Sequence, residues 1–122
     1  MDDEAINEVF APLGPVMIRR MFSGKGIYFR GVIVAILLKG ELRLKADTIS
    51  APDFAAAGAV QWIYDGHRGP VSMPYWSIPD DAHDNADAMK HWLRLAFEAA
   101  LRAPIPKKTI KPSAAAPKPR RA

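Results

Sequence analysis

The sequence predicts an α+β fold in which an antiparallel sheet has helices packed on one side, and three observations support this. Short runs of β-branched and aromatic residues, separated by glycine and proline turns, lie between residues 16 and 45 and again between residues 60 and 76. An amphipathic stretch over residues 86–102 predicts a long surface helix. The length of 122 residues favours a single domain.

The first predicted element is a short helix over residues 3–11. Asp2 or Asp3 can cap its N-terminus, and Gly14-Pro15 ends it. Its apolar residues recur at helical spacing and form one stripe, made of Ile6, Val9, Phe10 and Leu13.

Four strands are predicted next, over residues 16–22, 27–30, 32–38 and 41–45. The segment Ser23-Gly24-Lys25-Gly26 is predicted as a turn, because glycine adopts positive φ without steric strain. The nearly continuous apolar run of the third strand predicts a central strand covered on both faces. Strict alternation in the fourth predicts a half-exposed strand. Short loops between the four predict an antiparallel meander.

The second half of the domain is predicted to begin with a short helix over residues 52–57, which Gly58 ends. A strand over residues 60–64 follows, and residues 65–70 carry strong turn chemistry that predicts a loop. The next strand is expected over residues 71–76. Its Pro74 cannot donate a backbone hydrogen bond, which places the strand at a sheet edge or at a bulge.

The longest helix is predicted over residues 86–102, with Asn85 as its N-cap. Its polar face carries Asp87, Lys90, His91, Arg94 and Glu98. Its apolar face carries Met89, Trp92, Leu93, Ala96, Phe97, Ala100 and Leu101. This pattern is typical of a surface helix laid on a sheet.

Composition restricts the class of protein. The chain has no cysteine, which excludes disulfides and thiolate metal sites. The acidic N-terminus, Met1-Asp2-Asp3-Glu4, is unlike a signal peptide. The longest aliphatic run is seven residues, whereas a membrane helix needs about 20. We therefore expect a cytoplasmic protein that does not contact a membrane.

Charge divides the chain into two regions. Residues 103–122 hold six basic residues and no acidic one, whereas residues 1–102 hold 11 basic and 13 acidic residues. The second region is also rich in proline and alanine, so it cannot bury enough surface to order itself. The sequence thus predicts a folded domain over residues 1–102 and a disordered basic tail over residues 103–122.

The strongest candidate for a phosphate-binding loop is Gly24-Lys25-Gly26. The glycine spacing of a P-loop is missing, and a strand rather than a helix is predicted to follow, so a hairpin turn is favoured. The adjacent Arg19 and Arg20 point to opposite faces of a strand. They either contact an anion or partner, or form one structural ion pair and one solvated side chain, and the second interpretation is favoured.

Signals for catalysis or metal binding are weak. His83, Asp87 and His91 have helical spacing for metal ligands, but acidic residues there are also what a helix N-terminus favours. No Gly-x-Ser-x-Gly nucleophile elbow is present. His67, beside Asp65 in a glycine-rich loop, lacks an identified nucleophile and is expected to be solvated. We therefore expect no enzyme activity, no metal and no cofactor.

Two features are compatible with nucleic-acid binding. Trp62, Tyr64, Tyr75 and Trp76 suit a base-stacking platform, although aromatic residues at alternate strand positions are more often core residues. The tail suits non-specific, salt-sensitive phosphate contacts, or it serves only as a solubilising segment. Its basic residues are Lys107, Lys108, Lys111, Lys118, Arg120 and Arg121.

Several motifs recur in the order of one known family. They are Leu13-Gly14-Pro15-Val16, Arg19-Arg20-Met21-Phe22, Gly24-Lys25-Gly26-Ile27-Tyr28, Leu42-Arg43-Leu44-Lys45-Ala46-Asp47, Met73-Pro74-Tyr75-Trp76-Ser77-Ile78-Pro79 and the closing helix with Trp92, Arg94, Leu95 and Ala96. Over about residues 5–101 the chain resembles the TfoX (Sxy) N-terminal domain family, and the tail lies outside the resemblance.

The resemblance implies an α+β sandwich similar to the secretion-chaperone fold and an association with competence regulation. Full-length members of this family resemble transcriptional coactivators that work with the cyclic-AMP receptor protein and carry a second, helical C-terminal domain. We expect this chain to lack that domain and to end in the basic tail. The family supplies no catalytic residues.

Two functions are therefore expected. The first is a non-enzymatic regulator of competence or transcription that contacts a protein partner through the exposed residues Arg19, Arg20, Lys25, His67 and Arg68. The second is a nucleic-acid-binding protein that uses the six basic residues of the tail. The sequence fixes neither the partner nor the oligomeric state.

Overall fold

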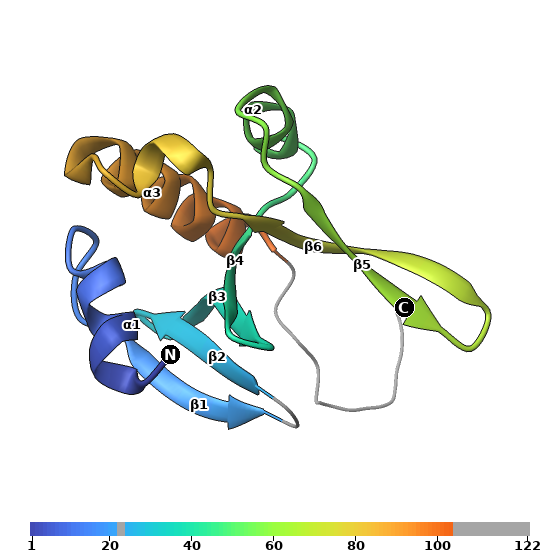
Figure 1. Cartoon of the computed structure of the whole chain (residues 1–122), viewed down its shortest axis with the longest axis horizontal. Helices are drawn as coiled ribbons and strands as arrows, with labels where there is room; N and C mark the ends of the chain where they lie inside the picture. Colours follow the sequence, from blue (N-terminus) through green and yellow to red (C-terminus); the bar gives the residue numbers. More distant parts are fainter. Residues whose placement is uncertain (22–23, 104–122) are drawn as a thin grey trace, which may run out of the picture.

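The computed structural model of the protein describes residues 1–21 and 24–103 (Figure 1). Its elements are, in chain order, α1 (Asp3–Phe10), β1 (Met17–Met21), β2 (Gly24–Phe29), β3 (Val32–Leu38), β4 (Glu41–Lys45), α2 (Ala51–Ala56), β5 (Gln61–Gly66), β6 (Gly69–Ser77), the 3-10 helix η1 (Asp80–Ala82) and α3 (Ala86–Arg102).

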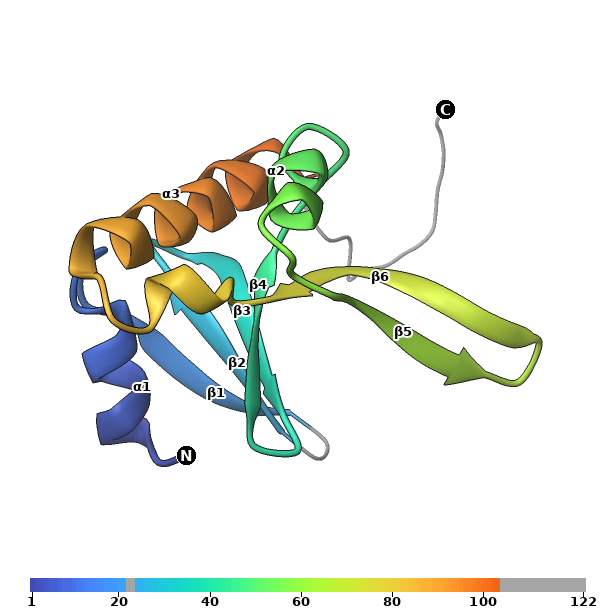
Figure 2. The ribbon, with the colours of Figure 1, turned by 45° about the horizontal axis from the view of Figure 1, so that its top comes forward.

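Six strands form one sheet in the order β1-β2-β3-β4-β6-β5, and every neighbouring pair is antiparallel. The first four strands make the meander that the short loops predict. The chain then leaves the sheet for α2 and returns in a hairpin, in which β6 pairs with β4 and β5 becomes the outer edge. Figure 2 shows this hairpin projecting from the rest of the molecule.

One face of the sheet is covered by the helices. α3 packs across β3 and β4, and the apolar faces of all three α-helices join a single core with this face. The fully buried members of the core include Ile6 and Phe10 of α1, Phe54 of α2 and Leu93 of α3. This arrangement confirms the predicted α+β architecture. The helices pack on this face because it buries their apolar stripes.

Local chemistry fixes the helix boundaries where the sequence predicts them. The carboxylate of Asp2 accepts a hydrogen bond of 2.9 Å from the amide of Ala5, which caps α1. The side chain of Asn85 accepts bonds of 3.0 and 3.1 Å from the amides of Asp87 and Ala88, which caps α3. Both side chains satisfy amides that have no partner within the helix.

The prediction that Ser23-Gly24-Lys25-Gly26 is a turn is wrong for its last three residues, whereas Ser23 lies outside the described residues. Gly24, Lys25 and Gly26 belong to β2, where they pair with β1 on one side and β3 on the other. The role of these glycines is close packing. A Cβ atom on Gly24 would collide with the carbonyl oxygen of Leu37, and one on Gly26 would lie 2.9 Å from the sulfur of Met21.

The predicted loop over residues 65–70 is also wrong for most of its length. β5 extends to Gly66 and β6 begins at Gly69, so only His67 and Arg68 connect the strands. Gly69 adopts φ +109°, which an L-residue rarely adopts, and this permits the tight connection.

Pro74 does not mark an edge strand, because β6 lies between β4 and β5. It lies where the pairing of β6 with β5 shifts register, between Gln61 and Ile63, so the bulge interpretation is confirmed. The Gln61 side chain donates a hydrogen bond of 2.9 Å to the carbonyl of Met73 at this irregularity.

The apolar run of β3 forms an inner strand, as predicted, but helices cover only one of its faces. On the other face Ile36 is 4% exposed, yet it lies outside the helix-covered core. The expectation that this strand is covered on both faces is confirmed for residues 34–37, all of which are buried. Across the described residues the second face of the sheet has no helix over it, and we call it the open face.

Candidate functional site

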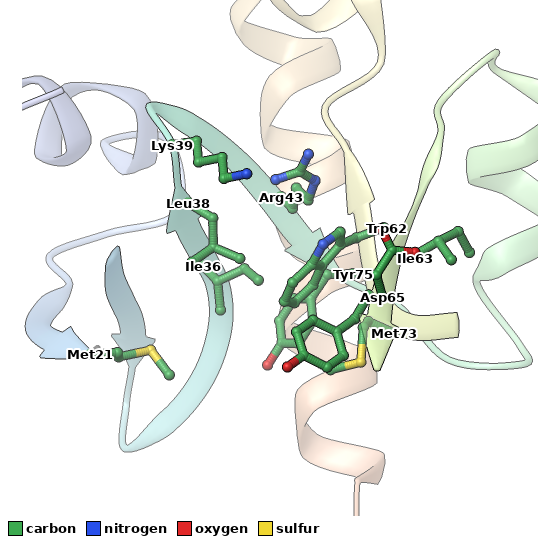
Figure 3. A pocket seen from close by; sticks show the side chains of 11 residues that line it. Met21, Ile36, Leu38, Lys39, Arg43, Trp62, Ile63, Asp65, Met73 and Tyr75 are labelled. Atoms are coloured by element: carbon green, nitrogen blue, oxygen red, sulfur yellow. The ribbon is translucent and has the colours of Figure 1, made fainter. Parts of the chain in front are cut away.

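The open face is hollowed into a groove of about 910 Å³ (Figure 3). We call it the sheet groove. Residues from β1, β3, β4 and the β3–β4 connection line one side, and residues of the β5–β6 hairpin line the other. The lining residues are Met21, Ile36, Leu38, Lys39, Arg43, Trp62, Ile63, Tyr64, Asp65, Met73 and Tyr75.

The curvature of the sheet forms the groove. Met21 lies on the edge strand β1 and Tyr64 on the opposite edge strand β5, yet both line the same hollow. The arrangement requires the sheet to curl so that the β5–β6 hairpin faces the meander, as Figure 2 shows. The lining residues of β3 and β6 alternate, as one face of a strand requires, whereas the four consecutive residues 62–65 of β5 border the groove.

The floor of the groove is apolar and largely shielded from water. Ile36 is 4% exposed and Tyr75 is 8% exposed, and both lie outside the helix-covered core. Burial raises the pKa of the Tyr75 phenol to about 12, since the ionised form is disfavoured in an apolar environment. Tyr75 therefore stays neutral at physiological pH.

The aromatic residues divide between the two faces of the sheet. Trp76 is directed to the core, where its ring centroid lies 6.3 Å from that of Phe54. Trp62 and Tyr64 line the groove and contact each other edge to face, with centroids 6.2 Å apart. Tyr64 is 51% exposed. The prediction of a buried role is confirmed for Trp76 and for Tyr75, which is 8% exposed, and it is wrong for Trp62 and Tyr64.

Cationic side chains lie over three aromatic rings of the open face. Arg43 lies 5.9 Å from the ring centroid of Trp62, and Lys45 lies 5.2 Å from that of Tyr75. Arg19 lies 5.7 Å from that of Tyr28. Such contacts are attractive because the ring face is electronegative. Burial lowers the pKa of Lys45, and the charge of Asp47 opposes this effect.

Charge differs between the meander strands and α1. Residues 17–45, which include the meander strands, contain seven basic residues and one acidic residue. Residues 2–8, which include most of α1 on the covered face, contain four acidic residues and no basic one. On or beside the open face, basic side chains outnumber acidic ones: Arg19, Lys39, Arg43 and Lys45 lie there with Asp65 and with Glu41, which pairs with Arg43 at 2.9 Å. An apolar hollow with an excess of basic groups suits a ligand with apolar and anionic groups.

The structure separates the predicted contact residues. Arg19 pairs with Gly26 on the open face, and Arg20 pairs with Lys25 on the other face. Both arginines are exposed because β1 is an edge strand. None of the ion pairs found within the described ranges includes either of them, so the structural ion pair favoured from the sequence is absent there.

Lys25 was predicted as an exposed contact but serves the fold. Its ammonium lies 2.6 Å from a carboxylate oxygen of Asp3, which ties β2 to α1. His67 and Arg68 are exposed at the tip of the β5–β6 hairpin and do not line the groove. The six basic residues of the tail lie outside the described residues, as does the predicted tail from residue 104 onward.

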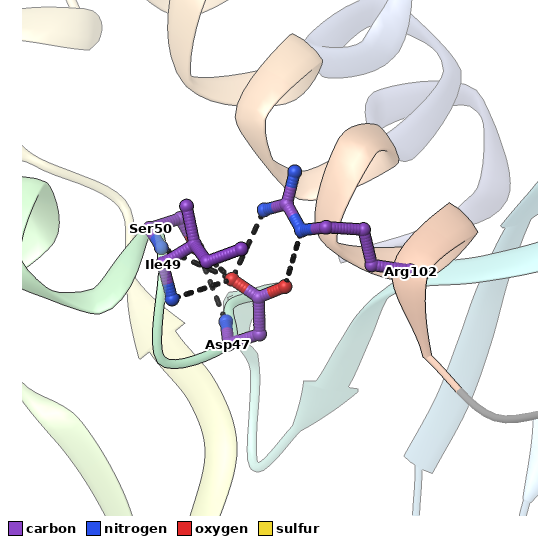
Figure 4. Close-up of polar contacts among 4 residues, drawn as sticks. All are labelled: Asp47, Ile49, Ser50 and Arg102. Carbon is purple, nitrogen blue, oxygen red and sulfur yellow. Dashed lines mark hydrogen bonds and ion pairs between the residues drawn. The ribbon is translucent and has the colours of Figure 1, made fainter.

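A polar cluster that the sequence does not predict joins α3 to the segment between β4 and α2 (Figure 4). Asp47 accepts hydrogen bonds of 2.7 and 3.0 Å from the guanidinium of Arg102. It also accepts bonds from the amides of Ile49 and Ser50, at 3.1 and 3.0 Å. These donors hold the pKa of the carboxyl well below its ordinary value of 3.8. Every group is already paired, which indicates a structural role.

The three residues considered as metal ligands from their spacing do not assemble. His83 caps the 3-10 helix ahead of α3, whereas Asp87 and His91 lie within α3. In the part of the chain that the structure describes, no three His, Asp or Glu side chains lie together as a metal-binding group.

None of the helices in the described ranges is long and apolar enough to cross a membrane.

Comparison with known proteins identifies one family. The model of the TfoX N-terminal domain matches residues 8–100, which span β1 to β6, η1 and almost all of α3. No curated protein matches the chain. The matched region includes every residue that lines the sheet groove.

Proposed function

Because this chain belongs to the TfoX N-terminal domain family, we propose that it is a non-enzymatic, cytoplasmic regulator of competence or transcription that acts through protein contacts. The contact surface in this proposal is the sheet groove, and the partner is a protein segment with apolar and acidic side chains. The basic residues beside the groove attract the carboxylates, and the hollow receives the apolar groups.

The observation that supports this proposal is an apolar hollow on the face of the sheet that the helices leave uncovered. The core on the opposite face already holds the fully buried apolar residues of all three α-helices. The groove lies on the other face, and Met21, Met73 and Trp62 remain only partly buried within it. Partly exposed apolar surface in a concave site is typical of protein-binding surfaces, and methionine adapts to varied partners.

Affinity capture from the native cell extract tests the proposal. Met73→Glu places a charge in the groove, and Ala86→Glu adds the same charge at an exposed position of α3. Wild type and Ala86→Glu are expected to retain the same protein, identified by mass spectrometry, whereas Met73→Glu loses it. Circular dichroism checks that both variants fold. Equal capture by Met73→Glu would exclude the groove as the contact surface.

The charge of residues 103–122 favours a second candidate function, nucleic-acid binding by the tail. The segment has six basic residues and no acidic one, and phosphate contacts of this kind weaken steeply with salt. Replacing all six by glutamine is expected to abolish retardation of a DNA fragment in a low-salt gel. Unchanged retardation would exclude the tail as the binding segment.

A further inference from the structure

We propose that two copies of this chain associate through their β5 strands, which pair antiparallel about a twofold axis at Ile63 and continue the sheet from one copy into the other. The inference goes beyond the proposed function, because it concerns the free protein and needs no partner. Three observations support the proposal: the β5–β6 hairpin has few contacts with the rest of the molecule, the outer edge of β5 has no strand partner in the described sheet, and the sequence of β5 is complementary to itself.

The β5–β6 hairpin has little support from the rest of the molecule. β4 pairs only with Tyr75, Trp76 and Ser77 of β6, and the next residue, Ala46, donates a hydrogen bond of 3.0 Å to the carbonyl of Pro74. Residues 69–73 of β6 therefore have no strand partner other than β5 in the described sheet. The hairpin projects away from the helices in both views of the ribbon (Figures 1 and 2). A two-stranded ribbon is marginally stable by itself. Additional pairing along its free side would therefore stabilise it.

The hairpin also exposes a cluster of large apolar side chains. Ile63 is 46% exposed, Tyr64 is 51% exposed and Val71 is 48% exposed. Tyr64 and Val71 lie directly opposite each other in the ladder and therefore share one face of the ribbon. Clustered exposed apolar surface of this kind marks interaction sites.

The two edges of the sheet differ in how they resist pairing. β1 carries Arg19 and Arg20, both exposed, and charged residues on an edge strand oppose pairing with another chain. β5 has the sequence Gln-Trp-Ile-Tyr-Asp-Gly, with one charge near its end and neither lysine nor proline. Its outer side has no strand partner in the described sheet. Of the two edges, β5 is therefore the one suited to pairing.

The sequence of β5 is complementary to itself in one register. With a twofold axis at Ile63, Trp62 of each copy lies opposite Tyr64 of the other, and Gln61 lies opposite Asp65. The two aromatic residues can then pack across the strands, and no like charges meet. An axis at Tyr64 would instead place Asp65 opposite Ile63. With Ile63 opposite itself, the twofold axis is perpendicular to the sheet, so the open faces of the two copies lie on the same side. Tyr64 of the second copy then joins the groove wall beside Trp62 of the first.

The mass of the full chain in solution tests this inference. Light scattering during gel filtration, over a series of concentrations, is expected to give twice the 13.4 kDa of one chain. Ile63→Lys places like charges opposite each other on the axis and should yield a monomer. Met17→Lys makes the same change at a 59% exposed position of the β1 edge and should leave the dimer intact. Thermal unfolding checks that both variants remain folded.

A disulfide trap tests the register independently, since the chain has no cysteine. Residues directly opposite in an antiparallel pair have Cα atoms about 4.5–5.5 Å apart, within the range of a disulfide. Ile63→Cys should therefore form a covalent dimer on mild oxidation, and Met17→Cys should not. A monomer at every concentration, a dimer that survives Ile63→Lys, or equal cross-linking of the two cysteine variants would each overturn the proposal.

Discussion

At the scale of single residues, Asp47 shows how one side chain can fasten two distant segments. It accepts hydrogen bonds from Arg102, which is 55 residues away, and from two amides of its own turn. The turn positions the carboxylate, and the planar guanidinium meets both of its oxygens. Because the last turn of α3 is held in this way, the end of the helix stays against the segment that leads from β4 to α2.

Replacing Asp47 with asparagine is expected to lower the free energy of unfolding by about 1–2 kcal/mol at pH 7, because the charged acceptor is lost at a partly exposed site. The pKa of Asp47 is depressed in the folded state, so its stabilisation is present above about pH 4 and is lost as the pH falls. Urea unfolding at several pH values measures the effect.

The difference between wild type and Asp47→Asn should therefore shrink in acid. Glu8→Gln, at an exposed position of α1, is the control and should change stability little at any of these pH values. A wild-type advantage that persists unchanged at pH 2 would contradict the assigned role of the Asp47 carboxylate.

At the scale of elements, β2 shows that glycine can serve packing within a strand. Gly24 faces the carbonyl of Leu37 on β3, and Gly26 lies beneath Met21 and Tyr28 on the open face. Neither is among the glycines with positive φ, which include Gly31 and Gly40 in the connections that follow β2 and β3. The two kinds of glycine therefore respond differently to an added methyl group.

Gly24→Ala is expected to destabilise the protein by about 2–3 kcal/mol, because the new Cβ collides with backbone that can move only by shifting β3. Gly31→Ala meets nothing within 4 Å and carries only the strain of φ +86°, about 1 kcal/mol. Chemical denaturation of both variants measures which substitution lowers the free energy of unfolding more. A larger loss of unfolding free energy for Gly31→Ala would show that the strain of a positive φ outweighs the collision at Gly24.

At the scale of the whole molecule, stability and binding are assigned to opposite faces of one sheet. The helix-covered face holds the fully buried core, and the open face holds the aromatic groove with basic residues around it. Substitutions on the two faces should therefore separate loss of folding from loss of partner contact.

Leu93→Ala removes a fully buried side chain from the core and is expected to lower the free energy of unfolding by about 2–5 kcal/mol. Tyr64→Ala removes a side chain that is 51% exposed and should lower it by less than about 1 kcal/mol. Thermal unfolding and partner capture, measured on both, give the comparison. Tyr64→Ala should lose capture while staying folded. Retained capture by Tyr64→Ala would count against the groove.

Much of the local structure could be predicted from the sequence. The bounds of β3, β4 and α3 match their predictions. β3 is a continuous apolar run between turn residues, and β4 and α3 have the periodicity of an element with one buried face. The aromatic groove could not be predicted in the same way. Alternation places Trp62 and Tyr64 on one face, but it does not say which face of the sheet the helices cover.

The sequence by itself determined the helices, the caps of α1 and α3, the meander and the family, because these depend on contacts between near neighbours in the chain and on recurring motifs. The tertiary structure alone decided that Gly24 and Gly26 lie inside a strand, that Tyr75 faces a groove and that Asp47 meets Arg102. Each of these depends on how the sheet curls and which of its faces the helices cover. Both are set by packing among residues far apart in the chain, which no local pattern encodes.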